Sequence, residues 1–403
     1  MELFWLEHKK LWRKKIVKIC VLLCFVYYVI FGSILSFQWF CFGSSGDYTS
    51  AFGNNFDGYT VIKDSQEYAL SFGGELTDET LQQIVSDYQQ MEADGMEEEL
   101  EKTDWQIVNS WLGTLYPELR DTSNYKTMIS YVDPDKLTGF YERRQQALDE
   151  FLEVSGQVGA EKEFLHQIER KVEKPFRYEW VEGWSTLLGS MVADLGVVMA
   201  LFLGIVLSSL FAGEWHDNTS TLVLTTRNGW GKIALAKILT GLAFTVELFA
   251  LLAVSNVISQ LFFMGTAGWD MPIQNIKLIA VAPMNMLQAE IYEYAFVLLG
   301  AIGFAGIVMF ISAAVKNNVL TLLLSLAVVY GPMMIAEYLP YEMQKALDLI
   351  PLVGSSTDIF RTNTFRILGK LIWSPYLLIT IPVLIGILCM PFAIKSWSRR
   401  MKA

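Results

Sequence analysis

Residues 186–212 read TLLGSMVADLGVVMALFLGIVLSSLFA, an apolar run in which Asp194 is the one charged residue. A helix needs about 20 apolar residues to cross a bilayer at a rise of about 1.5 Å per residue. A run of this length therefore predicts a transmembrane helix, and five other stretches meet the same criterion. The predicted spans are 16–42, 186–212, 238–264, 291–315, 319–336 and 371–394.

Charge is divided unequally along the chain. Of the 403 residues, 53% are hydrophobic, the mean hydropathy is +0.34 and the formal net charge is −11. The region 43–185 holds 29 acidic and 12 basic residues, a balance of −17, whereas the rest holds 13 and 19, a balance of +6. These values predict a membrane body and a separate acidic aqueous domain. An acidic surface argues against nucleic acid as a partner.

Basic residues set the expected orientation, because short cytoplasmic loops are enriched in Lys and Arg. With six spans, four basic groups fall on one side, although the opposing connection 337–370 also carries four bases and weakens the contrast. Both termini are therefore expected in the cytoplasm, and residues 43–185 are expected to be extracytoplasmic. The four groups are Lys9, Lys10, Arg13, Lys14 and Lys15; Arg227, Lys232 and Lys237; Lys316; and Lys395, Arg399, Arg400 and Lys402.

The acidic region 43–185 has the pattern of a helical domain. Leu81 and Ile84 recur at helical spacing after a candidate N-cap at Thr77 or Asp78. A second helical pattern begins at Asp133. The expected fold is an all-α membrane protein with six transmembrane helices and a mainly helical domain between the first and the second.

Side chains typical of enzymes and metal sites are sparse. The chain has three histidines without metal-ligand spacing, and it has no phosphate-binding loop. Cys20 and Cys24 are one helical turn apart and are interpreted as packing residues rather than ligands. We therefore predict no catalytic, cofactor-binding or metal site in this chain, and no ATP hydrolysis by it.

Three acidic residues fall inside predicted spans: Asp194, Glu247 and Glu293. Ionisable groups are costly in lipid and face a protein interior or a water-filled cavity. Glu247 lies nearest the centre of its span, where it either lines a cavity or proton-sensitive site or accepts a hydrogen bond from Ser, Thr or Asn on a neighbouring helix. Asp194 and Glu293 are expected nearer the outer interface, where solvation costs less.

Residues 1–15, MELFWLEHKKLWRKK, combine apolar side chains such as Leu3, Phe4, Leu11 and Trp12 with a strongly basic face. A helix of this kind is typical of the inner headgroup layer of a bilayer. A plain basic flank of the first span would carry the same charge, and both interpretations stay open.

The segment 213–237, GEWHDNTSTLVLTTRNGWGKIALAK, separates two apolar runs with a polar, turn-rich sequence. With the basic N-terminal helix, the first span, the large insertion and five further spans in 186–403, it resembles the membrane subunits of ATP-binding cassette exporters of the type-2 permease family. The stretch PFRYEWVEGW (175–184) is similar to the Gram-positive subgroup with a large extracytoplasmic insertion after the first span. The resemblance assigns coupling to an ATPase to Glu214, Thr221, Leu222, Arg227, Lys232 and Lys237.

The resemblance implies that 213–237 docks into a separate cytoplasmic ATPase subunit, which would hold ATP and Mg. A short helix with charged ends between two spans suits such a polar interface, and the alternative is an ordinary turn. A second permease copy or a sister permease would complete the path through the bilayer, and 337–370 would form an outer helical connection. The expected location is a bacterial cell membrane.

The expected function is the permease subunit of an ATP-driven exporter, with a peptide or a lipid-linked compound as the favoured cargo. Two other classes stay open. The chain could be a membrane sensor whose outer domain binds an extracellular peptide without transport, or a secondary transporter that runs on Glu247 and an ion gradient.

Overall fold

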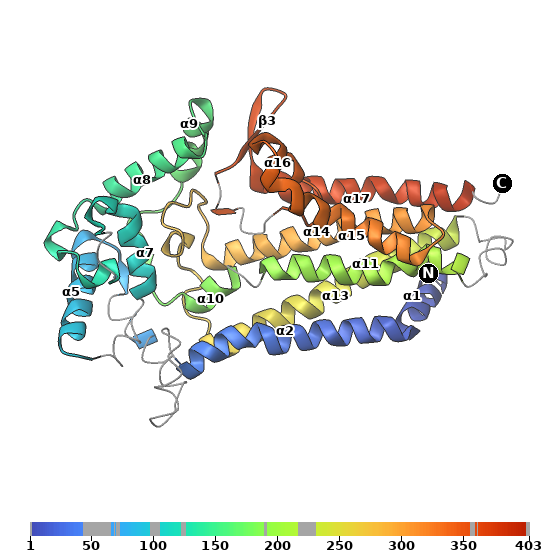
Figure 1. Cartoon of the computed structure of the whole chain (residues 1–403), viewed down its shortest axis with the longest axis horizontal. Helices are drawn as coiled ribbons and strands as arrows, with labels where there is room; N and C mark the ends of the chain where they lie inside the picture. Colours follow the sequence, from blue (N-terminus) through green and yellow to red (C-terminus); the bar gives the residue numbers. More distant parts are fainter. Residues whose placement is uncertain are drawn as a thin grey trace.

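The computed structural model describes residues 2–42, 66–67, 69, 73–96, 105–121, 126–188, 192–216, 231–354, 359–360 and 362–399. It is mainly helical, as predicted. Long helices lie along the longest axis of the molecule, and shorter helices form a domain at one end of them (Figure 1). We call the end of the bundle that carries the N-terminus the α1 end, and the opposite end the domain end.

Five helices of the described chain are long and apolar enough to cross a membrane. Large apolar side chains such as Phe262, Leu323 and Leu388 are exposed on their outer faces, and apolar surface of this extent marks contact with lipid or protein. These helices indicate a membrane-embedded protein, and each overlaps one of the last five predicted spans. They are α11 (Val192–His216), α13 (Lys232–Met264), α14 (Met286–Ala314), α15 (Asn318–Ile335) and α17 (Ser374–Arg399).

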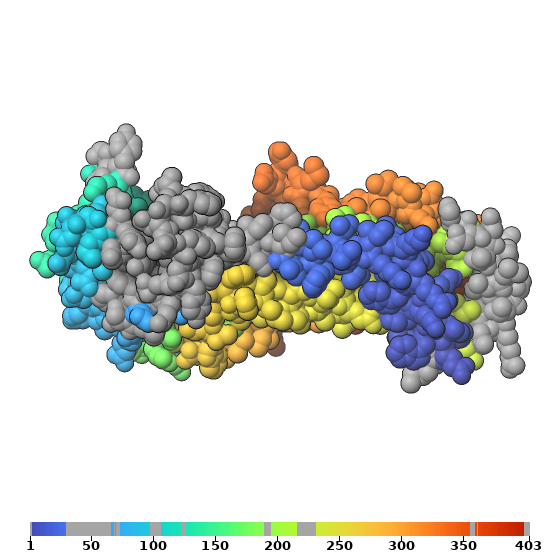
Figure 2. Space-filling model, turned by 90° about the horizontal axis from the view of Figure 1, so that it is seen from below, coloured from blue at the N-terminus to red at the C-terminus, as the bar shows by residue number. Residues whose placement is uncertain are grey.

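Two helices precede them in the chain. Helix α2 (Lys15–Phe42) covers the first predicted span and runs along the bundle beside α13. Helix α1 (Glu2–Arg13) lies across the α1 end instead, as the blue segments of Figures 1 and 2 show. Cys20 and Cys24 are both buried among apolar side chains of the bundle.

Helices α14 and α17 form the most extensive helix pair of the bundle. Gly303 and Gly306 of α14 face Pro382 and Gly386 of α17, and a Cβ atom on either of the first two would overlap backbone atoms of the opposite helix. Small residues at such positions let two helix backbones approach closely in a membrane. The two helices therefore pack as one unit through their backbones.

The domain at the far end is built from α5 (Asp78–Ala93), α7 (Trp105–Leu115), α8 (Phe140–Val154) and α9 (Ala160–Glu169). Strand β1 (Gly74–Glu75) pairs antiparallel with β2 (Arg177–Tyr178), which closes the domain where the chain returns to the bundle through the short helix α10 (Glu182–Thr186). We call this unit the insertion domain.

The predicted helical stripe of the insertion domain is confirmed. Leu81 and Ile84 are buried in its core together with Trp111 and Phe140, and the Thr77 hydroxyl caps α5 by accepting a hydrogen bond from the Thr80 amide. The second helix was expected from Asp133, but Pro134–Lys136 form a single 3-10 turn and α8 begins only at Phe140. Gly139 lies between them with a φ of 72°, which ends the turn and lets α8 start in a new direction.

The connection between α15 and α17 is not wholly helical, contrary to the expectation for 337–370. It contains a 3-10 turn (Ala336–Tyr338) and the short helix α16 (Tyr341–Leu347), followed by a hairpin of β3 (Thr364–Ile367) and β4 (Lys370–Trp373). Leu368 and Gly369 join the two strands with φ values of 50° and 80°. Two consecutive positive φ values are typical of a tight hairpin turn, so this local geometry favours strands.

The glycine contact between α14 and α17 leads to a stability prediction. Replacing Gly306 by Ala should lower the free energy of unfolding by about 1–3 kcal/mol, because the added methyl meets the Gly386 backbone, which cannot rotate away. Thermal unfolding in detergent or nanodiscs measures the effect. Gly331→Ala on α15 is the matched control, since nothing lies within 4 Å of its added Cβ. Equal unfolding temperatures for the two variants would show that the α14–α17 contact has room for a methyl group.

Candidate functional site

A buried cluster of charges joins three helices at the α1 end. Lys237, in the second turn of α13, is only 2% exposed, and Glu214, near the last turn of α11, is 4% exposed. The Lys237 Nζ lies 2.9 Å from Glu214 Oε1 and 2.8 Å from Oε2 of Glu7 on α1. It also donates to the Leu210 carbonyl oxygen at 3.1 Å. The ammonium group therefore uses its three donors on α1 and α11 at once.

Lys10 is a second residue of α1 that contributes to the cluster. Its Nζ lies 2.5 Å from the same Glu214 Oε1 that Lys237 contacts. Two lysines and two glutamates thus balance in charge. Glu214 and Lys237 are buried, whereas Glu7 is 17% and Lys10 is 53% exposed, and an unpaired charge at either buried position is strongly unfavourable. One turn further along the chain, the Lys14 Nζ donates to the Ser209 hydroxyl of α11 at 2.9 Å. We call Glu7, Lys10, Glu214 and Lys237 the coupling cluster.

Of the six residues to which sequence reasoning assigned coupling, the structure brings Glu214 and Lys237 together. Lys232 is exposed in the first turn of α13. Thr221, Leu222 and Arg227 lie outside the described residues. Glu214 is buried, and Lys10 of α1 contacts its carboxylate.

Glu247 has partners that the sequence interpretation did not include. Its carboxylate accepts a hydrogen bond from the Trp12 indole nitrogen at 3.0 Å and lies 3.2 Å from the His8 Nε2. The carboxylate side chain remains 43% exposed. Helix α1 therefore contacts α13 at two places. Glu7 reaches Lys237 near the start of α13, and His8 reaches Glu247 further along the helix.

Asp194 and Glu293 are the other two acidic residues of the predicted spans. The Asp194 side chain lies outside the described residues. Glu293, expected near an interface with cheap solvation, is instead fully buried in α14, one turn from the equally buried Glu290. Glu293 is buried because neighbouring helices and the return segment of the insertion domain cover this end of α14.

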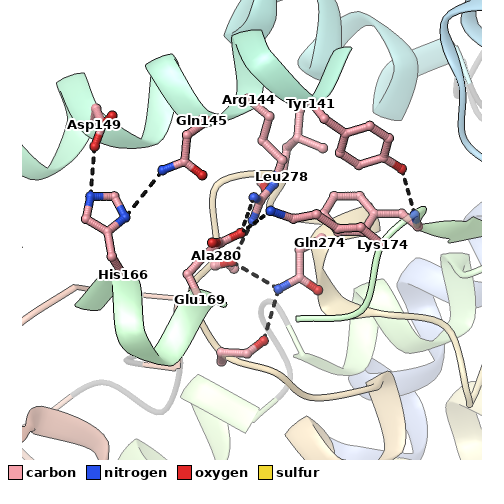
Figure 3. A network of polar contacts seen from close by, with 12 residues as sticks. Tyr141, Arg144, Gln145, Asp149, His166, Glu169, Lys174, Gln274, Leu278 and Ala280 are labelled. Carbon is pink, nitrogen blue, oxygen red and sulfur yellow. Dashed lines mark hydrogen bonds and ion pairs between the residues drawn. The ribbon is translucent and has the colours of Figure 1, made fainter. Parts of the chain in front are cut away.

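A second polar network fixes the insertion domain to the bundle (Figure 3). Arg144 of α8 is fully buried and points at Glu169 of α9, with its Nη1 2.6 Å from Oε1. Its other nitrogens donate to carbonyl oxygens of the α13–α14 connection, Leu278 at 2.8 Å and Ala280 at 3.3 Å. One guanidinium thus ties two domain helices to a connection between two long helices.

Further contacts widen this attachment. The Trp111 indole nitrogen donates to the Asn275 carbonyl oxygen at 3.0 Å, and the Asn275 amide donates to the Arg177 carbonyl oxygen at 3.0 Å. On the side of the hairpin, Arg366 Nη2 lies 2.5 Å from Oε1 of Glu161 on α9. The insertion domain therefore contacts both the connection between α13 and α14 and the connection between α15 and α17. We call this whole set of contacts the domain clamp.

Sequence reasoning missed Glu7, Lys10 and Arg144 as site residues, although Glu7 and Arg144 each leave some signal. Glu7 interrupts the basic face of residues 1–15, and an acid close to five basic residues is a candidate partner for a distant lysine. Arg144 lies on the same helical stripe as Phe140 and Leu148, which predicts burial for a charged side chain.

Comparison with protein-family models, with curated proteins and with solved structures finds no match to this chain. Within the described residues, no group of three or more His, Cys, Asp and Glu side chains is placed to hold a metal ion. The chemistry that the coupling cluster offers is the fixing of α1, α11 and α13 to one another by buried ion pairs.

The coupling cluster predicts a non-additive pair of substitutions. Glu214→Gln and Lys237→Met should each lower the free energy of unfolding, by up to about 3 kcal/mol, because each leaves buried charges out of balance. The double variant should lose less than the sum of the two, because it removes both charges together. Thermal unfolding followed by circular dichroism tests this. Lys395→Met, on the exposed face of α17, is the control, and additive losses would argue against a coupled pair.

The domain clamp predicts a dependence of stability on pH. Burial disfavours the Glu169 carboxylate, but hydrogen bonds from Lys174 and Arg144 outweigh it and hold the pKa below its ordinary value. A depressed pKa means that the folded state binds protons less readily, so this stabilisation is present above the unfolded pKa of about 4.3. It is lost as the pH falls through the lower folded value.

Glu169→Gln should therefore be less stable than the wild type at neutral pH and should lose less stability on acidification. Thermal unfolding of the full chain between pH 7 and pH 3 gives the comparison. Glu163→Gln, which removes an exposed acid from the same helix, should keep the wild-type profile. If Glu169→Gln keeps the wild-type dependence of unfolding temperature on pH, the domain clamp does not cause that dependence.

Proposed function

We propose that the chain is the permease subunit of an ATP-driven exporter and couples to a separate cytoplasmic ATPase subunit. The observation that carries the proposal is the buried pair of Glu214 and Lys237. These residues lie at the two helix ends that flank segment 217–230, and Glu7 and Lys10 add α1 to the same cluster. A force on the segment would therefore reach three helices together rather than one flexible turn.

The proposed mechanism follows from this connection. ATP binding closes two ATPase subunits, which displaces 213–237 and, through the coupling cluster, moves α1, α11 and α13. Helix α1 also holds α13 at Glu247, nearly three helical turns beyond Lys237 along the helix. Two contacts along one helix resist its rotation better than one, so displacement at the α1 end becomes tilting of α13.

The proposed topology has six spans, with α2 as the first. The α1 end faces the cytoplasm, both termini are cytoplasmic, and 43–185 is extracytoplasmic. The domain clamp supports a transport role, because contacts to Leu278 and Ala280 let the insertion domain follow α13 and α14 as they move. A second permease copy or a sister permease completes the path in a bacterial cell membrane, and a peptide or lipid-linked cargo suits a large domain at the outer surface.

A sensor without transport is the second candidate. The domain clamp favours it, because the same contacts would carry a signal from a bound peptide to α13 and α14. The two candidates differ when the ATPase partner is inactivated, since export then stops whereas peptide binding and signalling persist. An ion-gradient transporter is supported less well, because α1 covers one face of Glu247.

The proposal predicts contact between segment 213–237 and an ATPase. A co-expressed partner ATPase should be captured by a cross-linker at Thr221→Cys. Arg227→Ala should insert in the membrane normally and reduce cargo-stimulated ATP hydrolysis several-fold, because a misplaced docking element moves α11 and α13 together. Lys395→Ala at the same end of the bundle is the control. Lys316 is unsuitable for this purpose, since its Nζ lies 4.5 Å from the ring centroid of Trp215 beside the segment.

Unchanged coupling in Arg227→Ala, together with no cross-link at Thr221→Cys, would reduce 213–237 to an ordinary turn and remove the main support for an ATP-driven function.

A further inference from the structure

Two acids at the domain end of α14 lack the partners that buried acids require. Glu290 is 3% exposed and Glu293 is 0% exposed. None of their four carboxylate oxygens has a hydrogen-bond partner in the described part of the chain. Buried carboxylates are otherwise paired or hydrogen bonded, because their desolvation is strongly unfavourable. These two residues take no part in the coupling cluster or in the domain clamp.

A third oxygen atom belongs to the same surroundings. Asn256 of α13 is fully buried, and its Nδ2 donates to the Tyr294 hydroxyl at 3.1 Å. The Tyr294 hydroxyl in turn interacts with the Glu290 carboxylate, so Asn256 is connected to Glu290 through Tyr294. Its Oδ1 has no partner in the described chain. A neutral hydroxyl is thus what approaches Glu290, and neither Glu293 oxygen nor the Asn256 Oδ1 has a donor in the described chain. What this group lacks is positive charge or a proton.

The surrounding helices do not supply that charge. Helix α13 has no charged residue between Leu248 and Met264, and α17 has none before Lys395. Within the described chain, the titratable groups that interact with Glu290, Glu293 and Tyr294 are these three residues themselves and the phenol of Tyr28. All of these are neutral or acidic, and the Asp194 side chain of α11 lies outside the described residues.

We propose that Glu290, Glu293 and Asn256 form a binding site for one exchangeable cation, either a small hard metal ion or a proton. Carboxylate and amide oxygens are the ligands that ions such as Na⁺ and Ca²⁺ take. A proton serves the same purpose, because it removes one charge and lets that carboxyl group donate to a neighbouring oxygen. The site lies at the opposite end of the bundle from the coupling cluster and does not depend on an ATPase.

The site joins α13 to α14, and this gives the cation a role. An occupied site favours the arrangement in which both helices contribute oxygens, since a ligand stabilises the conformation that binds it. An empty, ionised site favours an arrangement in which water reaches the acids. Cation exchange would therefore shift the packing of the two helices that also hold the insertion domain.

The test uses the purified full chain in lipid nanodiscs. Unfolding temperatures are measured in NaCl, KCl, CaCl₂ and MgCl₂ against N-methylglucamine chloride at equal ionic strength, at pH 8 and at pH 5.5. A metal occupant should raise the unfolding temperature by about 3–5 °C at a hundredfold excess over its Kd at pH 8, and by less at pH 5.5, where protons compete. A proton occupant should raise it at pH 5.5 with no preference among the metal ions.

Variants separate this site from the other acids of the chain. Glu290→Gln and Glu293→Gln should lose the metal response, or the matching part of the pH response. Glu337→Gln, which changes an exposed acid at the same end of the bundle, should keep both. Asn256→Ala is the second test if a glutamine variant does not fold, because removing a neutral oxygen should weaken a metal response at least several-fold. If the wild type and these variants respond alike to every cation and pH, the proposal is overturned.

Discussion

Lys237 carries a positive charge that is almost wholly removed from water, and three helices are arranged around it. Its partners are Glu7 of α1 and, on α11, Glu214 and the Leu210 carbonyl oxygen. A buried ammonium group accepts few alternative geometries, because moving any partner leaves a charge unbalanced. The position of α1 across the bundle, and the spacing of α11 from α13, both follow from this requirement.

The opposite end of the bundle uses the same physical device with a different cation. Arg144 is a planar donor that reaches a carboxylate and two backbone carbonyl oxygens at once, a geometry that lysine does not offer. Between the two ends the bundle is held by apolar packing and by backbone contact between α14 and α17. The bundle thus has hydrogen bonds and ion pairs of fixed geometry at its ends and close apolar packing between them. This arrangement would suit a bundle whose ends transmit motion.

Much of the fold could be predicted because the relevant physics is local. Apolar runs of bilayer length identified helices such as α11 and α14, and helical spacing identified the buried stripe of Leu81 and Ile84. The hairpin after α16 was missed, although Leu368–Gly369 is a two-residue turn between two strands, because the family resemblance predicted a helical connection there. The burial of Glu293 could not be predicted, because it depends on which helices cover α14.

The candidate site divides in the same way. Glu214 and Lys237 are 23 residues apart and mark the ends of two consecutive helices, so their proximity could be expected from the sequence. Glu7 and Lys10 are separated from their partners by 230 and 204 residues, and charge alone does not select one partner among many. Pairings of this length depend on tertiary packing that no local pattern records.

The domain clamp also has a consequence for biosynthesis. Arg144 leaves the ribosome 134 residues before Leu278, the carbonyl that its Nε contacts. The insertion domain can form its own core early, as domains generally do during synthesis, but one side of α8 stays open until α13 and the connection after it have been made. Assembly of this protein therefore has two stages. The insertion domain folds first, and Arg144 makes its contact with the Leu278 carbonyl oxygen only after that part of the chain has been translated.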